Sequence, residues 1–505
     1  MTVYNINLGI GWSNSGIEYA QAYRAKILQR LGIPAKFIFS NILLANNLET
    51  LTSHLGLTDD QVIWLYNFFT DVKIAPTTYR LGQFERRLAP GFTKTVLDDG
   101  QRVQYTAGQL TAEARVVDRQ QGTIDRVLYF HQGKLIQDDS YSYVRYASTY
   151  YYGRKDQNYI VARDFYNEDG SRAYTQHFNN GRESFEFSDH QVICSKDDLY
   201  REMLRQLCFQ KGDVIMMDRL DEDQQLANGE LILENHGPAK LVVPIHADHY
   251  VPTDDGNILW NEYYDYQFNH SAAIDCFLFS TDQQRSRFVT QQLEFDHCRP
   301  QTAVIPVGSL ATLRHPRGSR RPFSLITASR LAPEKHLDWL IQAVVLARRA
   351  LPDLTLDIYG EGAGQAKLAS QIEAAGASDY IHLMGQQDLT TVYTRYAAYA
   401  SASTGEGFGL SLLEAIGSGL PVVGFDVPYG NQTLVDDGQN GYLIPYTAAW
   451  SVQEKAQKLA QGIIRLFHQD SLAAFRQHSY QLATPYLDQN VARQWQQFLG
   501  GLDDD

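Results

Sequence analysis

One glycine-rich segment near residue 410 carries the residue types needed to hold a phosphorylated ligand. Residues 405–414 contain three glycines and place two carboxylates, Glu406 and Glu414, eight positions apart. Glycines let backbone amides approach a ligand closely, and amides at the start of a helix favour a phosphate group there. Because eight residues span about two helical turns, we expect Glu414 on a helix and Glu406 on the loop before it.

A second charged segment, residues 329–335, supplies the positive charge that such a ligand requires. Arg330 and Lys335 follow a predicted strand at 323–327. In doubly wound folds ligands bind at the carboxyl ends of parallel strands, and cations there can neutralise a diphosphate. The simpler interpretation is a helix start with two exposed cations, and this segment alone does not decide between them.

The sequence around these two segments alternates between short apolar runs, which predict strands, and residues at helical spacing, which predict helices. Apolar runs predict strands at 4–8, 35–39, 62–66, 213–217, 241–246, 277–280 and 302–306, and again at 323–327, 354–359, 381–384, 399–401 and 421–425. Helical spacing follows the glycine loop at 9–16 and recurs at 337–345, 389–398 and 410–418. This alternation predicts an α/β chain with two doubly wound parallel sheets.

A tyrosine-rich stretch interrupts the first α/β region. Hairpin signals such as Asp99-Gly100 and Asn180-Gly181 predict an antiparallel β-meander there. The tyrosines between 141 and 152 are expected to pack across strands, the alternative being a surface for a protein acceptor or partner. The predicted domains are 1–76 with 211–312, the inserted 77–210, then 313–490, and a helical tail at 491–505. The basic stretch 314–321 is interpreted as a solvated linker, with contact to an anionic surface as the alternative.

The composition narrows the class of function. The 505 residues include 44 Lys plus Arg against 58 Asp plus Glu, a net charge of −14, and 44% of them are apolar. This charge disfavours sequence-independent binding of nucleic acid, since phosphate neutralisation needs a basic surface. Four cysteines without Cys-x-x-Cys spacing, no signal-like start and no apolar run of membrane length predict a reduced, cytoplasmic protein.

Together the two charged segments resemble the retaining nucleotide-sugar glycosyltransferases of family GT4, which have the GT-B architecture of two facing Rossmann-like domains. The turns at 357–362 and 438–443 are similar to further motifs of this family. Within this family, the sequence most resembles the GtfA-type glycosyltransferases of the accessory Sec system. These enzymes begin the O-glycosylation of serine-rich repeat adhesins in Gram-positive bacteria. The segments that carry this likeness are 5–12, 62–67, 246–250 and 426–433.

The resemblance implies a role for each residue of the candidate site. Arg330 and Lys335 would bind the donor diphosphate and stabilise the charge that grows on the leaving group. Glu406 and His246 would contact the donor sugar, and Glu414 would hold the ribose hydroxyls. The other donor-binding residues that the family implies are Gly16, Gly385, Gln386, Phe408, Gly409 and Leu410.

Two segments invite a metal interpretation that their spacing does not support. His246-Ala247-Asp248-His249 has no Glu after its first His and no third ligand at a known spacing. Asp221-Glu222-Asp223 matches the Asp-x-Asp pattern of metal-dependent glycosyltransferases of the other major fold, but it lies in a polar stretch expected to be a solvated loop. Because Arg330 and Lys335 already supply positive charge, neither a metal nor any other cofactor is expected.

The function implied by the resemblance is transfer of a sugar from a UDP donor to Ser or Thr of a serine-rich repeat protein. UDP-GlcNAc and UDP-glucose both remain open as the donor, since that choice depends on pocket shape. A GtfB-like partner subunit or a homo-oligomer, and a peripheral position on the inner face of the membrane, are further expectations. Two alternatives stay open: an enzyme that makes free glycan or glycolipid, and a non-catalytic subunit that recognises the acceptor.

Overall fold

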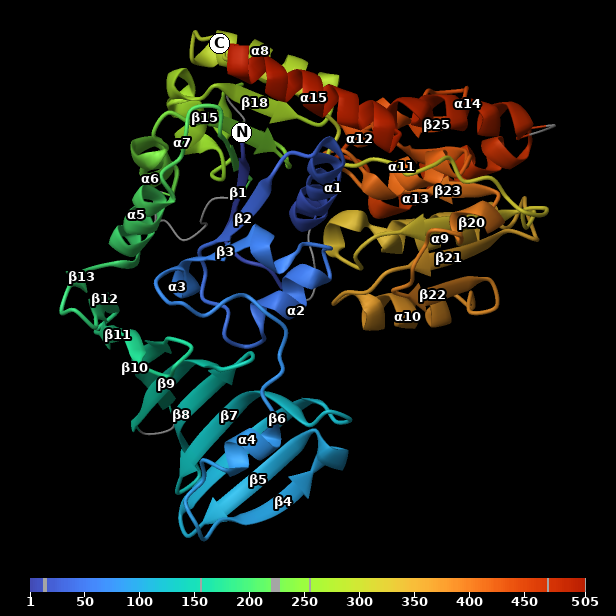
Figure 1. The fold of residues 1–505 in the computed structure, drawn as a ribbon. Coiled ribbons are helices and arrows are strands. Elements are labelled where there is room, and N and C mark those ends of the chain that lie inside the picture. Colours follow the sequence, from blue (N-terminus) through green and yellow to red (C-terminus); the bar gives the residue numbers. More distant parts are fainter. Residues whose placement is uncertain (12–15, 155–156, 219–227, 254–255, 470–471, 505) are drawn as a thin grey trace. The chain divides into compact units, whose positions relative to one another are not determined.

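The computed structural model describes residues 1–11, 16–154, 157–218, 228–253, 256–469 and 472–504 (Figure 1). The chain divides into two compact units. The first contains residues 1–25, 32–243 and 262–275, and the second contains residues 26–31, 244–261 and 276–505. The helix α1 (Gly16–Leu31) contributes to both.

The N-terminal sheet is parallel and has seven strands in the order β19-β18-β15-β14-β1-β2-β3. Its strands are β1 (Val3–Asn7), β2 (Ala35–Phe39), β3 (Val62–Trp64), β14 (Val214–Met217), β15 (Lys240–Ile245), β18 (Cys276–Phe279) and β19 (Thr302–Val304). The helices between them are α1, α2 (Leu48–Ser53), α3 (Leu65–Phe68), α5 (Lys196–Leu207), α6 (Asn228–Asn235), α7 (Asp265–Asn269) and α8 (Asp282–Phe295). The predicted α/β alternation is confirmed, with each strand within two residues of its predicted place.

A buried ion pair fixes the end of β14 in the first unit. Arg24 Nη2 lies 2.6 Å from Asp218 Oδ1, and the two side chains are 4% and 0% exposed. Arg24 also donates to Asn5 Oδ1 at 2.8 Å, and Gln21 donates to Asp218 at 3.0 Å. These bonds compensate charges that would otherwise be costly to bury.

The insertion is a single antiparallel sheet in which neighbours in sequence are neighbours in space, from β13 to β4 (Figure 1). Its strands are β4 (Thr93–Leu97), β5 (Arg102–Ala107), β6 (Leu110–Asp118), β7 (Thr123–His131), β8 (Lys134–Tyr141), β9 (Arg145–Arg154), β10 (Gln157–Tyr166), β11 (Arg172–Asn179), β12 (Arg182–Phe187) and β13 (Val192–Ile193). The predicted meander is confirmed. At the turn between β11 and β12, Asn180 and Gly181 both have positive φ, 49° and 79°, as a two-residue hairpin turn requires.

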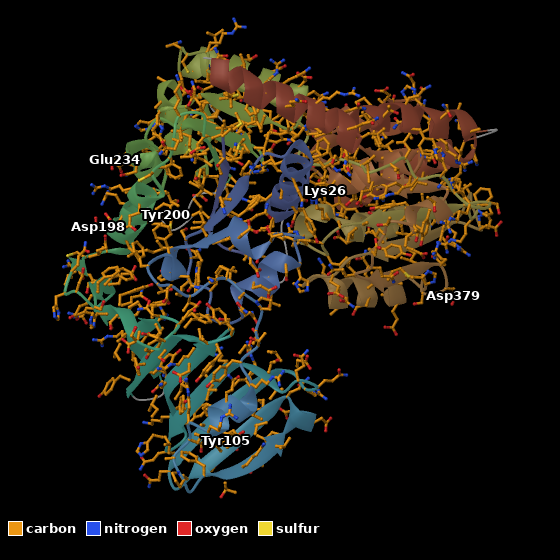
Figure 2. The ribbon with its side chains drawn as sticks, viewed as in Figure 1. Lys26, Tyr105, Asp198, Tyr200, Glu234 and Asp379 are labelled. Carbon is orange, nitrogen blue, oxygen red and sulfur yellow. The ribbon has the colours of Figure 1, made fainter. Side chains whose placement is uncertain are left out.

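The insertion has a small core of its own. The short helix α4 (Leu81–Glu85) packs on β5, where the rings of Phe84 and Tyr105 meet edge to face at 5.5 Å. Tyr105, labelled in Figure 2, is 3% exposed and donates a hydrogen bond to Glu85. Of the tyrosines expected to pack, Tyr141 and Tyr146 are buried, whereas Tyr152 is 62% exposed. The packing prediction therefore holds for only part of that group.

The C-terminal sheet lies wholly in the second unit and has six parallel strands in the order β22-β21-β20-β23-β24-β25. These strands are β20 (Ser324–Ala328), β21 (Thr355–Tyr359), β22 (Ile381–Gly385), β23 (Ala398–Ala400), β24 (Val422–Phe425) and β25 (Gly441–Ile444). The helices are α9 (Leu337–Ala347), α10 (Gln365–Ala374), α11 (Leu410–Gly417), α12 (Gly430–Leu434), α13 (Val452–Phe467), α14 (Ala473–Ala483) and α15 (Asp488–Asp504).

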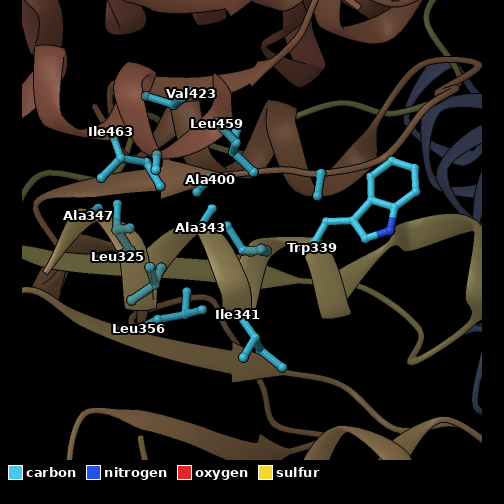
Figure 3. Close-up of a cluster of buried hydrophobic side chains, with 14 of the residues drawn as sticks. Leu325, Trp339, Ile341, Ala343, Ala347, Leu356, Ala400, Val423, Leu459 and Ile463 are labelled. Carbon is cyan, nitrogen blue, oxygen red and sulfur yellow. The ribbon is translucent and has the colours of Figure 1, made fainter. Parts of the chain in front are cut away.

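Both faces of this sheet are covered by apolar clusters, which is why its strands are almost continuously apolar. Leu325 of β20 packs with α9 and α13 in the cluster drawn in Figure 3, together with Leu356 and Ile463. Its neighbour Ile326 belongs to a different cluster, formed with α11. Alternate residues of one strand thus enter two cores, as expected for a doubly wound sheet.

One prediction for this region was wrong. The helix expected at 389–398 is only a 3-10 turn at Tyr393–Arg395. Thr390 instead bonds Asp388 through both its backbone and its hydroxyl, and such side-chain bonds compete with helix formation. The stretch 314–321 is exposed at residues 315–319, as expected of a solvated linker, and Arg320 anchors it to the C-terminal sheet. The guanidinium of Arg320 donates to four backbone carbonyls, those of Tyr393, Thr394, Tyr396 and Ser418.

Within the described ranges, no helix combines the length and the apolarity needed to cross a bilayer. The four cysteines are free. Asp221-Glu222-Asp223, together with residues 12–15 of the first glycine loop, lies outside the described residues. The limits predicted for the domains stay a prediction.

Candidate active site

The cationic segment begins where β20 ends. Ser329 N donates to Tyr359 O and Leu331 N donates to Glu361 O, so the backbone of 329–331 runs against the end of β21. Gly360 must be glycine here, because a Cβ would lie 1.9 Å from Ser329 O. After Arg330 the chain forms a 3-10 turn, Pro333–Lys335, that leads into α9.

The two cations of this segment differ in their surroundings. Arg330 is exposed, and its Nη2 lies 3.0 Å from Glu334 Oε1, an exposed contact that water weakens. Lys335 is largely buried, with a side chain 19% exposed, and its Nζ lies 2.7 Å from Glu406 Oε1. The lysine of one predicted motif thus touches the first carboxylate of the other.

The glycine loop that carries Glu406 is anchored by backbone bonds to the segment after β24. Glu406 N donates to Pro428 O at 3.0 Å, and Glu406 O accepts from Tyr429 N and Gly430 N at 2.7 Å each. Gly430 also has no room for a side chain, since a Cβ there would lie 2.1 Å from Phe408 O. These contacts fix the position of Glu406 relative to the start of α11.

Glu414 lies on α11, one residue past its middle, while Glu406 lies on the loop before the helix. Tyr393 OH donates to Glu414 Oε2 at 3.1 Å. Burial raises the pKa of the Glu414 carboxyl, and the charge of Arg314 and the Tyr393 bond offset part of that rise. Both α11 and the loop stem from β23, so one strand end presents both carboxylates.

His246 directly follows β15, and its backbone lies against the glycine loop. A Cβ on Gly407 would lie 2.8 Å from His246 O, and one on Gly405 would lie 3.8 Å from Asp248 Oδ2. Three residues on, His249 is fully buried, contacts Gln291 Oε1 through Nε2 at 2.8 Å and stacks on Tyr429 at 6.3 Å. The loop 246–249 therefore packs on the segment that positions Glu406.

The other predicted residues are placed as follows. Phe408 is buried, and Gly409 has a φ of 86° immediately before α11. Leu410 is the first residue of α11, Gly385 ends β22 with a φ of 68°, and Gln386 is exposed beyond it. Gly16 begins α1 in the first unit, and its approach to the other residues stays a prediction.

The chain is similar to known proteins over almost its whole length. Residues 322–469 match the family described as glycosyl transferases group 1, and residues 95–189 match the GtfA extended beta-sheet domain. The chain is 52% identical to a UDP-N-acetylglucosamine–peptide N-acetylglucosaminyltransferase GtfA subunit of Limosilactobacillus reuteri, an alignment that covers 99% of both chains.

The chain belongs to the GtfA family. Two solved structures of this family resemble it over their whole length. One is the pneumococcal O-GlcNAc transferase GtfA in complex with UDP and GlcNAc, with a TM-score of 0.93, 41% identity and coverage of 100% of this chain and 99% of that one. The other is a GtfA/B complex, with a TM-score of 0.92, 45% identity and full coverage of both chains. The protein is thus a glycosyltransferase with the GT-B fold, as the sequence predicts.

GtfA-family sequence motifs did not reveal two contacts that shape the site. Tyr429 lies in a predicted motif, but its role in holding the Glu406 backbone depends on a tertiary contact. His336, next to Lys335, stacks on Trp339 at 3.6 Å and lies 3.3 Å from Thr404 Oγ1 through Nε2. In the sequence, His336 is a histidine between a charged turn and a helix. That pattern is too common to identify His336 as a residue of the site.

The described residues hold no group of three or more His, Cys, Asp or Glu side chains arranged for a metal ion. His249, part of the segment weighed as a zinc motif, instead contacts Gln291. Asp221-Glu222-Asp223 lies outside the described part of the chain.

Proposed function

We propose that this chain transfers GlcNAc from UDP-GlcNAc to Ser or Thr hydroxyls of a serine-rich repeat protein, with retention at the anomeric carbon. The observation that carries the proposal is the 2.7 Å contact between Lys335 and Glu406 beside the start of α11. It joins a cation suited to a diphosphate with a carboxylate suited to sugar hydroxyls. The names of the relatives, which specify UDP-N-acetylglucosamine and peptide, support the same donor and acceptor class.

The donor diphosphate would bind to Arg330 and Lys335. Arg330 has five N–H donors and is exposed, so it can turn from Glu334 to a phosphate at little cost. Lys335 is held near the loop by Glu406, and the diphosphate would share its charge. As the bond to the sugar breaks, negative charge grows on the distal phosphate, and fixed cations stabilise that state more than the ground state.

The sugar and ribose would be held by the two carboxylates. Glu406 would accept hydrogen bonds from sugar hydroxyls, and His246, at the end of β15, would contact the same sugar. Glu414 would accept from the ribose hydroxyls, with Tyr393 holding the second oxygen of the carboxylate. The amides of Phe408, Gly409 and Leu410 would meet the distal phosphate at the start of α11. Gly385 and Gln386 would border the uracil, and Gly16 would complete the phosphate site.

The configuration at the anomeric carbon would be retained because the acceptor hydroxyl attacks that carbon from the same face from which the phosphate leaves. The acceptor hydroxyl would form the new bond to the anomeric carbon while the bond to the phosphate oxygen breaks. Its proton would pass to that same phosphate oxygen, so atoms and charge balance without a separate strong base. We propose that no divalent cation is required, since Arg330 and Lys335 supply the positive charge. Transfer that persists in EDTA supports this part of the proposal.

The partner and the location belong to the proposal too. A relative at 45% identity forms a GtfA/B complex, which favours a GtfB-type subunit over a homo-oligomer as the partner of this chain. We propose that the complex acts in the cytoplasm, peripherally at the inner face of the membrane, before the acceptor is exported.

The experiment that tests the function is transfer to a serine-rich peptide, followed by intact mass. Reactions contain UDP-GlcNAc or UDP-glucose, with and without the GtfB-type subunit. A HexNAc increment from UDP-GlcNAc supports the proposal. A hexose increment, or modification of a lipid or free sugar but never of the peptide, contradicts it. UDP release without any modification shows that the donor is right and the acceptor wrong.

A further inference from the structure

One face of α8 carries three buried side chains at the spacing of a single helix stripe, and two of them are amides. Gln284, Phe288 and Gln291 are four and then three residues apart, so they lie on the same side of the helix. Apolar residues usually fill such a stripe. A buried amide is costly unless it is hydrogen-bonded. The two glutamines therefore need partners inside the fold, and both have them in the loop 246–249 that follows β15.

Gln284 holds the backbone of this loop next to His246. Its Nε2 donates to Ala247 O at 2.7 Å. The glutamine is itself fixed by the start of the helix, where the hydroxyl of Thr281 accepts from Gln284 N at 3.2 Å. The first turn of α8 thus holds the carbonyl of the residue that directly follows His246.

Gln291 holds the side chain of His249, the buried histidine at the other end of the loop. Gln291 Oε1 lies 2.8 Å from His249 Nε2. Burial lowers the pKa of His249 to about 4, so the ring is neutral at pH 7. Because a carboxamide oxygen only accepts, the single N–H of the ring is at Nε2 and donates to Gln291. Phe288, between the two glutamines, meets the His249 ring edge to face at 5.6 Å.

These two bonds connect α8 to both residues that would contact the donor sugar. The bond of Gln284 ends one residue from His246. Glu406 is connected through His249, whose ring stacks on Tyr429 at 6.3 Å. Tyr429 N in turn donates to Glu406 O at 2.7 Å. One helix face therefore supports both proposed sugar contacts.

We propose that Gln284 and Gln291 are positioning residues that set the affinity of the enzyme for the sugar half of its donor. Both side chains are buried, so they act through the loops that carry His246 and Glu406 and not by touching the donor. The nucleotide half should not depend on them, because its proposed contacts lie after β20 and on α11. The inference rests on the proposed function and adds to it a support for the sugar contacts.

The test replaces each glutamine by leucine, which has a similar size but no hydrogen-bonding group in its side chain. Gln284→Leu and Gln291→Leu each remove one bond to the loop. Gln292→Leu is the matched control, because Gln292 is also a buried glutamine of α8 but bonds the end of its own helix. Its Nε2 donates to Asp296 Oδ2 at 2.6 Å, and its Oε1 accepts from Cys298 Sγ at 3.0 Å.

Three quantities are measured for the parent and each variant, with the GtfB-type subunit present. They are the Kd for UDP-GlcNAc, the Kd for UDP, both by calorimetry, and the Tm. Gln284→Leu and Gln291→Leu should each raise the Kd for UDP-GlcNAc about tenfold, the effect of losing one hydrogen bond between the sugar and a charged residue. The Kd for UDP should change less than twofold. Gln292→Leu should lower the Tm by a similar amount and keep both parent Kd values.

A parent-like Kd for UDP-GlcNAc in both loop variants overturns the inference. An equal rise in the Kd for UDP also overturns it, and so does the same loss of sugar affinity in Gln292→Leu, because the glutamines would then act only on the stability of the fold. A parent chain that does not bind UDP-GlcNAc overturns the proposed function itself, and the inference with it. A parent chain that binds UDP-GlcNAc but never modifies the peptide overturns the proposed acceptor alone.

Discussion

Gly407 offers the sharpest single perturbation of the site, because the structure leaves no room for one methyl group there. A Cβ at this position would lie 2.8 Å from His246 O, whereas contacts of this kind are ordinary beyond about 3.4 Å. In Gly407→Ala, the glycine loop or the His246 loop must therefore move by about 0.6 Å. Both loops carry residues that would contact the donor sugar.

The expected consequence is a loss of activity without a loss of fold. A misplacement of about 1 Å costs about 100-fold in rate, so a movement of half that size should lower kcat/KM for UDP-GlcNAc by about tenfold. Gly405→Ala is the matched control, since its Cβ would lie 3.8 Å from Asp248 Oδ2, an ordinary contact. Steady-state transfer kinetics and thermal unfolding of both variants check the prediction. Equal activities in the two variants would refute the steric argument.

Three further perturbations test other parts of the account. Arg330→Ala and Lys335→Ala should each lower kcat about 100-fold or more with the Tm unchanged, measured as peptide transfer; near-parent rates in both would remove the diphosphate role. Arg24→Ala leaves the buried Asp218 charge unpaired and should lower the free energy of unfolding by about 3–5 kcal/mol in a urea titration, so that a loss below about 1 kcal/mol would contradict it. Burial lowers the pKa of His249 to about 4 from an ordinary 6.5. The unfolded chain therefore binds the extra proton first, and stability should fall by up to about 3 kcal/mol as pH drops from 6.5 toward 4. His249→Gln should flatten that pH dependence, and an unchanged slope would contradict it.

The parts of the fold that the sequence predicts well depend on local patterns. Strands such as β20 and β24 are continuous apolar runs because both of their faces are buried. The hairpin at Asn180-Gly181 was predictable for a similar reason, since few residues adopt two successive positive φ angles. Local chemistry also placed Glu406 on a loop and Glu414 on a helix.

The features that the sequence did not predict depend on contacts between distant segments of the chain. In the sequence, Arg320 is one of several arginines in a linker and nothing distinguishes it. Only in the folded chain do four backbone carbonyls lie within hydrogen-bond distance of its guanidinium. The contact of Gly407 with His246 O, and the backbone bonds between Tyr429 and Glu406, likewise join segments that share no sequence signal. The helix predicted at 389–398 does not form because Thr390 bonds Asp388 instead. The spacing of apolar residues carries no information about such side-chain bonds.

The most direct test of the central claim is the intact mass of a serine-rich peptide after incubation with the chain, its GtfB-type subunit, EDTA and equal amounts of UDP-GlcNAc and UDP-glucose. The account predicts a HexNAc increment on the peptide, formed without a divalent cation and lost in Lys335→Ala. An unmodified peptide with no UDP released, or an increment that survives in Lys335→Ala, would contradict it.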